Sequence, residues 1–157
     1  MKLTANITLD ELTKSQVAER KGINNNPSPE QIENLKALAV NILQPVRSHF
    51  DKPLIISSGF RCPQLCLEIG SSVNSQHCAD EEAAAADFEI PGVDNKELGT
   101  WIRNNLEVDQ GILEFYKDGE PSSGWIHVSY SRNNNRQQWL RAMREEGKVI
   151  YKPWLGE

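Results

Sequence analysis

Apolar residues at helical spacing mark one long element near the start of the chain. Between residues 28 and 50 they recur every three or four positions, which is the pattern of one face of an amphipathic helix. The set is Ile32, Leu35, Leu38, Ala39, Ile42, Leu43, Val46 and Phe50. Ser28 and Pro29 suit the first turn, and Gln31 stands where a capping box needs it. Pro45 interrupts the pattern and predicts either a kink in the last turn or an early end.

The rest of the chain predicts short strands alternating with helices. We expect a buried strand at 53–57, a strand around 87–90, a helix capped by Asp94, strands at about 110–116 and 125–130, a helix at roughly 136–145 and a last strand at 149–151. This order indicates an α+β domain with a central antiparallel sheet flanked by helices. At 157 residues the chain fits one such domain, in which residues 1–26 are expected to form an N-terminal surface arm.

The overall composition is that of an ordinary globular protein, with 38% hydrophobic and 25% charged residues. A net charge of −5 argues against nucleic acid as a partner, since phosphate binding needs a concentrated basic surface. The apolar runs are too short to cross a bilayer, and the N-terminus lacks the apolar stretch of a signal peptide. We therefore expect a monomer that is synthesised in the cytoplasm and does not insert into membranes.

Three cysteines, Cys62, Cys66 and Cys78, lie within seventeen residues of one another. An odd count without a signal peptide argues against a disulfide framework. We interpret them as small buried side chains rather than thiolate ligands, because Cys62 and Cys66 lack the close spacing of a structural zinc site.

The three histidines occupy very different contexts. His49 ends the first long helix, where a cation is favoured, and has a structural interpretation. His77 lies in a polar loop, whereas His127 lies mid-strand with Trp125 and Ser129 on its own face. Asp87 likewise points away from the buried face of its strand. Two imidazoles and a carboxylate suit zinc and leave a fourth position for water, although a lone strand histidine is more often a hydrogen-bonded core residue.

Four ordered motifs connect these residues: Ser57-Ser58-Gly59-Phe60-Arg61-Cys62-Pro63, Ser75-Gln76-His77, Ala85-Ala86-Asp87-Phe88 and Trp125-Ile126-His127-Val128-Ser129. Together they resemble the zinc D-Ala-D-Ala carboxypeptidase family, in particular its small single-domain branch from phages and bacteria. The resemblance implies a hedgehog- and DD-peptidase-like fold with a zinc site in a surface cleft. It implies His77, Asp87 and His127 as zinc ligands. It also implies that Arg61 stabilises the carbonyl oxygen or binds the substrate carboxylate, a role that suits a fixed guanidinium; the alternative for Arg61 is a salt bridge that anchors its loop.

The sequence departs from the family pattern in three places. The carboxylate usually follows the histidine by seven residues, but Asp87 follows His77 by ten. The extra residues either bulge out or misplace a ligand, and Asp80 is a conceivable substitute. Relatives often carry an acid three residues before the last histidine, where this chain has Gly124. They also often have Asn where Cys66 stands.

Glu114 is the candidate replacement for the missing acid. It lies among apolar residues of a predicted strand, where burial would raise its pKa toward values useful for a general base. Whether it lies beside His127 depends on a strand register that the sequence leaves open, so a surface or salt-bridged glutamate is the alternative. Ser75 and Ser129 are candidates for orienting the imidazoles, and Trp125 for an apolar wall of the cleft; ordinary polar positions and a core Trp are the alternatives.

The resemblance predicts a zinc-dependent metallopeptidase that hydrolyses peptides of bacterial peptidoglycan, as a D-Ala-D-Ala carboxypeptidase or an endopeptidase. It would act on the cell wall after release, as a phage-encoded lytic enzyme does. One alternative is an inactive relative that binds peptidoglycan or serves as a phage structural protein. Another is a metal-dependent hydrolase acting on a different small substrate through the same ligands.

Overall fold

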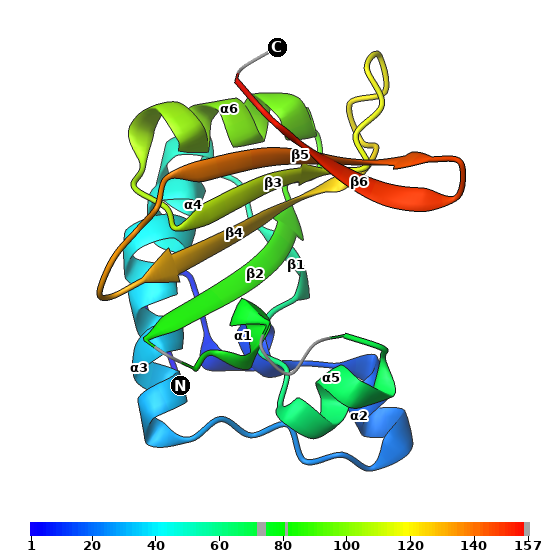
Figure 1. The fold of residues 1–157 in the computed structure, drawn as a ribbon. Helices are drawn as coiled ribbons and strands as arrows, with labels where there is room; N and C mark the ends of the chain where they lie inside the picture. Colours follow the sequence, from blue (N-terminus) through cyan, green and yellow to red (C-terminus); the bar gives the residue numbers. More distant parts are fainter. Residues whose placement is uncertain (72–74, 81, 156–157) are drawn as a thin grey trace.

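The computed structural model describes residues 1–71, 75–80 and 82–155. These residues fold around one six-stranded sheet (Figure 1). The strands are β1 (Ile55–Ser58), β2 (Ala83–Glu89), β3 (Gln110–Glu114), β4 (Trp125–Ser131), β5 (Gln138–Glu145) and β6 (Lys148–Pro153). Their order across the sheet is β1-β2-β4-β3-β5-β6. All neighbouring pairs are antiparallel except β3 and β5, which are parallel. The predicted α+β domain is therefore present, but its sheet is mixed at one pair.

The helical elements are α1 (Leu9–Thr13), α2 (Gln16–Lys21), α3 (Pro29–Leu38), the π-helical segment η1 (Ala39–Leu43), α4 (Gln44–Phe50), α5 (Pro63–Glu68), the 3₁₀ turn η2 (Gln76–Cys78) and α6 (Asn95–Asn105). Ser28 and Gln31 form the predicted capping box of α3, and Asp94 caps α6. The long helix runs through Pro45 to Phe50. Pro45 falls in the first turn of α4, and the preceding Gln44 amide donates to Ala39 five residues back. The helix thus accommodates the missing N–H by widening before the proline.

One face of the sheet packs on helices. Ala84, Ala86 and Phe88 of β2 and Ile126 and Val128 of β4 have no solvent exposure and join the core formed with α3, α4 and α6. In Figure 1 α3 and α4 lie behind the sheet, and α6 lies at the top of the view. Because successive side chains of a strand alternate between faces, the residues between them project to the opposite side.

The expected helix at 136–145 is wrong, because residues 138–145 form the strand β5 and residues 136 and 137 lead into it. Trp139 and Ala142 are buried at a spacing of three, which fits a helix as well as a strand. The deciding contacts are long-range, because β5 pairs with both β3 and β6. Glu146 and Gly147 both have positive φ, of 50° and 79°, and so form the tight turn into β6.

Two further expectations are corrected by burial. The strand expected to be buried, β1, lies at the edge of the sheet, and Ile55 is 52% exposed. Residues 1–26, expected as a surface arm, form α1 and α2 and contribute Leu3, Ile7 and Leu12 to the core. No helix among the described residues is long and apolar enough to cross a membrane.

Candidate metal centre

The sheet face away from the helices carries a carboxylate and an imidazole side by side. The register pairs Asp87 of β2 with His127 of β4, and His127 with Ile112 of β3. Directly paired residues of neighbouring strands project to the same face. Ala86 and Phe88, on either side of Asp87, point into the helical core. The alternation therefore turns Asp87 and His127 together to the other side.

His77 reaches the same place from a short turn. Ser75 caps η2, and its hydroxyl accepts a hydrogen bond from the His77 amide at 3.2 Å. The ring Nδ1 of His77 lies 2.7 Å from the carbonyl oxygen of Gly59. A carbonyl oxygen only accepts, so Nδ1 carries the proton and the neutral ring keeps its lone pair on Nε2. That Nε2 faces Asp87, with 3.5 Å between Nε2 and Oδ1.

Gly59 places the carbonyl that fixes this tautomer. A Cβ atom there would lie 2.3 Å from the carbonyl oxygen of Leu12, so glycine alone lets the chain pass this close to α1. The Phe60 amide donates to the same oxygen at 2.6 Å, and the Arg61 amide donates to the His77 carbonyl at 2.9 Å. This loop is thereby bonded to both α1 and η2, and it holds His77 over the sheet.

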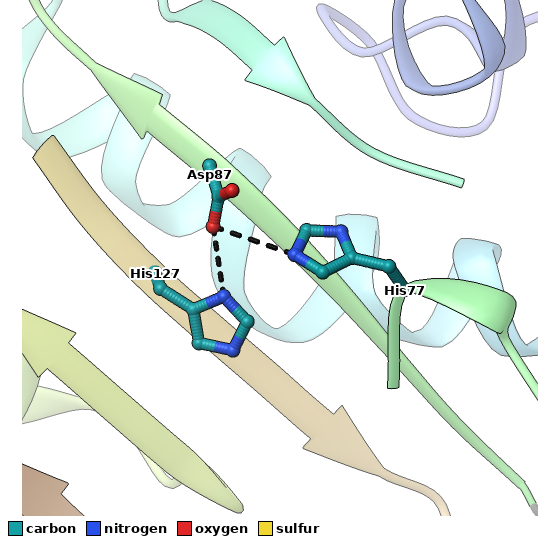
Figure 2. A group of neighbouring side chains, drawn as sticks. All are labelled: His77, Asp87 and His127. Carbon is teal, nitrogen blue, oxygen red and sulfur yellow. Dashed lines mark hydrogen bonds and ion pairs between the residues drawn. The ribbon is translucent and has the colours of Figure 1, made fainter. Parts of the chain in front are cut away.

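The three side chains converge on one point (Figure 2). One potential ligand atom from each of His77, Asp87 and His127 lies within 4.8 Å of the others. His127 Nδ1 is 2.8 Å from Asp87 Oδ1, and the centroids of the two imidazole rings are 5.1 Å apart. His77 and Asp87 are buried, and His127 is partly buried.

The charge states of this group suit a metal ion. Burial lowers the pKa of His77 and outweighs the attraction of Asp87, so the ring is neutral at pH 7. Burial alone would raise the pKa of Asp87, but its hydrogen bond with His127 holds that pKa well below the ordinary aspartate value. A lone pair on His77 Nε2 therefore faces an ionised Oδ1, and two acceptors so placed call for a cation between them.

The three side chains fit zinc both in their ligand types and in the hydrogen bond that orients His77. Neutral imidazole and carboxylate are zinc ligands, and three of them leave a coordination position for water. The His77 Nδ1–H bond to a backbone carbonyl is the outer contact that metal-binding histidines commonly make.

Arg61 lies beside His77, Asp87 and His127 and makes one long contact with Asp87. Its Nη2 lies 3.6 Å from Asp87 Oδ2, and its Nε donates to Ser58 Oγ at 2.9 Å. The side chain is 18% exposed. Arg61 therefore pairs with Asp87 at long range and keeps further N–H groups for another anion.

Glu114 lies on the same face of the sheet, one strand from His127. It pairs with Trp125, whose Nε1 donates to Glu114 Oε2 at 2.6 Å. Burial and the negative charge of Asp87 raise the pKa of Glu114 above its ordinary value. Gly124, where relatives carry an acid, has φ of 65°, and a Cβ atom there would lie 1.9 Å from the Glu114 carbonyl oxygen. No larger residue fits at 124 in this backbone, whereas Glu114 brings a carboxylate to this face from β3.

The longer spacing between His77 and Asp87 leaves both side chains at the centre. Asp80, the conceivable substitute ligand, is exposed and accepts a hydrogen bond from Gln31 Nε2 at 3.1 Å. It is not among the three grouped residues. The chain reaches β2 through Ala79 and Glu82, whose φ angles are 55° and 64°. The extra length is absorbed between η2 and β2; residue 81 lies outside the described residues.

The two serines contact backbone rather than imidazole. Ser75 positions His77 through its amide, as described above. Ser129 Oγ accepts from the Gln110 amide at 3.1 Å and lies 3.4 Å from the Gln110 carbonyl oxygen. These contacts fix η2 and the β3–β4 pair instead of orienting a ring.

A second buried carboxylate escaped the sequence analysis. Asp109, 4% exposed, accepts from Nε and Nη2 of Arg136, both at 3.0 Å, and from the Arg136 amide at 3.1 Å. Gln76, beside His77, donates to the same carboxylate. Val108-Asp109-Gln110 carries no motif, and Arg136 is 27 residues away, so no local signal marks the pair.

A cavity of about 710 Å³ runs along β1 next to this centre. Its lining includes Ser58, Gly59 and Arg61 as well as Lys14 and Arg20. His77, Asp87 and His127 are not in its lining. The cavity adjoins the candidate centre through Gly59, whose carbonyl oxygen contacts His77, and through Arg61, which contacts Asp87.

The sequence profile of the family described as Peptidase M15 matches residues 5–129. This range spans most of the chain and includes every residue of the candidate centre. The chain belongs to the peptidase M15 family. The resemblance to zinc D-Ala-D-Ala carboxypeptidases is thereby confirmed at the level of the family, and a peptidase activity is what membership indicates. β5 and β6 lie outside the matched range of this M15 chain. No curated protein sequence matches it.

Proposed function

We propose that this M15 protein is a zinc-dependent peptidase that cleaves stem peptides of bacterial peptidoglycan, as a D-Ala-D-Ala carboxypeptidase or an endopeptidase. The observation that carries the proposal is the convergence of His77 Nε2, Asp87 and His127, in which a lone pair and an ionised carboxylate oxygen face each other. Family membership supports the reaction type, and the resemblance of the four motifs supports the substrate class.

In this proposal His77, Asp87 and His127 hold the zinc ion in a cleft of the sheet face. When bound, zinc activates water and polarises the scissile carbonyl. Glu114 takes the proton from the attacking water at Oε1, because Trp125 Nε1 holds its Oε2. The raised pKa of Glu114 favours this uptake, and the protonated carboxyl group then delivers the proton to the leaving amine.

Arg61 binds the negative oxygen that develops on the carbonyl, or the terminal carboxylate of the peptide. Its Nε is fixed by Ser58, so the guanidinium is oriented before substrate arrives. Trp125, held by Glu114, forms a wall beside the cleft. Ser75 and Ser129 support the centre through the backbone contacts of η2 and β3.

The first experiment measures metal content and cleavage together. The parent, His77→Ala, Asp87→Ala and His127→Ala are purified beside His49→Ala, a matched control whose exposed ring stacks on Trp101 at 4.2 Å. We expect about one zinc in the parent and in the control, and loss of both zinc and muropeptide cleavage in the other three. A parent that takes up no zinc would overturn the proposal and favour a metal-free relative that binds peptidoglycan.

The general base is tested separately. Glu114→Gln should lower kcat by about 10²- to 10⁴-fold while metal content stays unchanged. Glu120→Gln, at an exposed loop position, is the control and should retain full activity. Full activity in Glu114→Gln would assign the proton transfer to another group.

The site of action is part of the proposal. Peptidoglycan lies outside the cytoplasmic membrane, so a monomer made in the cytoplasm, such as a phage-encoded endolysin, acts once it is released to the wall. Zinc-loaded protein should then clear permeabilised bacterial cells, and the His127→Ala variant should not. Cleavage of free muropeptides without clearing would contradict the lytic role alone.

A further inference from the structure

Two of the three cysteines meet in the interior beside the candidate metal centre. Cys66 lies in α5 and Cys78 ends η2, directly after His77. Their Sγ atoms are 3.2 Å apart, and neither residue has solvent exposure. Cys62, at the start of α5, is partly buried, and all three are free thiols.

The sulfur pair is held by backbone contacts on both sides. On the α5 side, the Cys66 amide donates to Cys62 at 3.0 Å and the Cys66 carbonyl accepts from Ser71 at 2.7 Å. On the η2 side, the Cys78 amide donates to Ser75 at 3.0 Å. The Cys66 thiol lies 3.9 Å from the carbonyl of Arg61, which leaves its sulfur free to accept from Cys78. Both side chains thus project toward each other from fixed positions.

The separation is close to that of a covalent bond. A disulfide has an S–S length of about 2.0 Å, so bond formation needs the two sulfurs to approach by only about 1.2 Å. As free thiols, two cysteines at this distance stabilise the fold little more than other small buried side chains do. The same pair, once oxidised, would join α5 to the turn that carries His77.

We propose that Cys66 and Cys78 form an intramolecular disulfide when the protein meets an oxidising environment, and that the bond fastens His77 in place. The oxidant is a low-molecular-weight disulfide such as oxidised glutathione. One cysteine sulfur attacks it and releases one molecule of thiol, and the second cysteine sulfur then displaces the other. The two cysteines lose two electrons and two protons in total, and the small disulfide is reduced to two thiols.

Two consequences follow from the position of the bond. It closes a loop between Cys66 and Cys78, which are 12 positions apart, so it restricts the unfolded chain and raises the thermal midpoint by about 5 to 10 °C. It also ties η2, the turn that carries His77, to α5, so zinc release should slow. The second consequence rests on the proposed function, whereas the first does not.

The test compares the parent with Cys62→Ser, Cys66→Ser and Cys78→Ser. Each protein is unfolded and refolded in a glutathione redox buffer, because both target sulfurs are buried in the folded protein. Free thiols are counted in denaturant, and the intact mass is measured with and without reductant. We expect the parent to fall from three thiols to one and to lose the mass of two hydrogens. Cys62→Ser should fall from two to none, and the other two variants should keep both thiols.

Three results would overturn the proposal: a parent that retains all three thiols, a bond that includes Cys62, or disulfide-linked dimers. The thermal midpoint of the oxidised parent should drop on reduction, whereas that of Cys66→Ser should not change. Zinc release from oxidised and reduced parent is then followed with a chromogenic chelator. Equal rates would overturn the role in holding His77, whereas failure of the proposed function would appear as no zinc in either form.

Discussion

Two buried aspartates in this protein are paired with arginine, yet their surroundings differ in kind. Asp109 receives two guanidinium N–H groups at 3.0 Å, a backbone amide at 3.1 Å and the Gln76 amide, so its oxygens are saturated with donors. Asp87 has its arginine at 3.6 Å and one imidazole at 2.8 Å, while the second imidazole offers it a lone pair. The first arrangement is complete without an added ion, whereas the second has room in its bonding pattern for a cation, as proposed above. Burial and a nearby arginine are therefore common to the structural carboxylate and the candidate metal ligand, and the number of hydrogen-bond donors is what differs between them.

The largest effect should come from neutralising Asp87. Asp87→Asn keeps the shape of the side chain but removes the charge that a divalent ion needs. Metal affinity should fall by more than the ~10- to 100-fold that loss of a ligand's supporting partner costs. Asp109→Asn is the matched comparison and should still bind the metal. Equal metal affinities in the two variants, measured by competition with a chelator, would erase the distinction drawn between the two carboxylates.

For the free energy of unfolding we expect the opposite order, with a larger effect at Asp109 than at Asp87. Asp109→Ala leaves four donors without an acceptor, so it should lower the free energy of unfolding by about 1–3 kcal/mol. Asp87→Ala in metal-free protein should cost less, because Arg61 keeps Ser58 as a partner and faces solvent in part. Asp118→Ala is the control. Its carboxylate contacts Lys96 and Arg141 but is 69% exposed, so the change should have little effect on the free energy of unfolding. Urea unfolding of the metal-free proteins measures all three.

The free energy of unfolding should depend on pH differently in the parent and in the Asp109→Asn variant. Burial opposes ionisation of Asp109, but its hydrogen bonds with Arg136 and Gln76 prevail and lower its pKa below the ordinary 3.8. The unfolded chain then binds the proton first, so the stabilisation is present above that ordinary value and is lost as the pH falls below it. The stability gap between the parent and Asp109→Asn should accordingly narrow between pH 6 and pH 3. A gap that stays constant over this range would show that the carboxylate acts through shape rather than charge.

The sequence identified Asp87 and missed Asp109 for a physical reason. Asp87, His77 and His127 lie in short motifs whose residue types are those of a zinc site, so pattern and chemistry coincide. Asp109 matters only because Arg136 arrives from 27 residues away, through a contact that no local pattern encodes. The same holds for β5. Its residues fit a helical period, and the pairing with β3 that makes them a strand is long-range.

Capping and alternation were predicted more reliably than sheet edges. The caps Ser28 and Asp94 depend on neighbours in the sequence, and the structure confirms both. Phe88 and Ile90 join the core cluster, whereas Asp87 does not, although Asp87 is also buried. Exposure of Ile55 depends on β1 having one neighbouring strand, which the sequence does not state. The side of the sheet on which Glu114 lies needed the β3–β4 register, and the steric exclusion at Gly124 needed the backbone of both strands.

The smallest predicted effect asks whether the two aspartates act independently. Gln76 donates to Asp109, and the next residue, His77, faces Asp87, so η2 links the two sites. Gln76→Ala removes one hydrogen bond and should lower the free energy of unfolding by about 0.5–1.5 kcal/mol. Metal affinity should change less than tenfold, because Ser75 and Gly59 still hold His77 through its amide and its Nδ1. Gln16→Ala, also a glutamine in a first helical turn but distant from η2 in sequence, is the control for the substitution itself. Gln76→Ala could instead lower metal affinity as much as Asp87→Asn does. The hydrogen bonds of Asp109 with Gln76 and Arg136 would then support the metal centre, and the two carboxylates would form one coupled network.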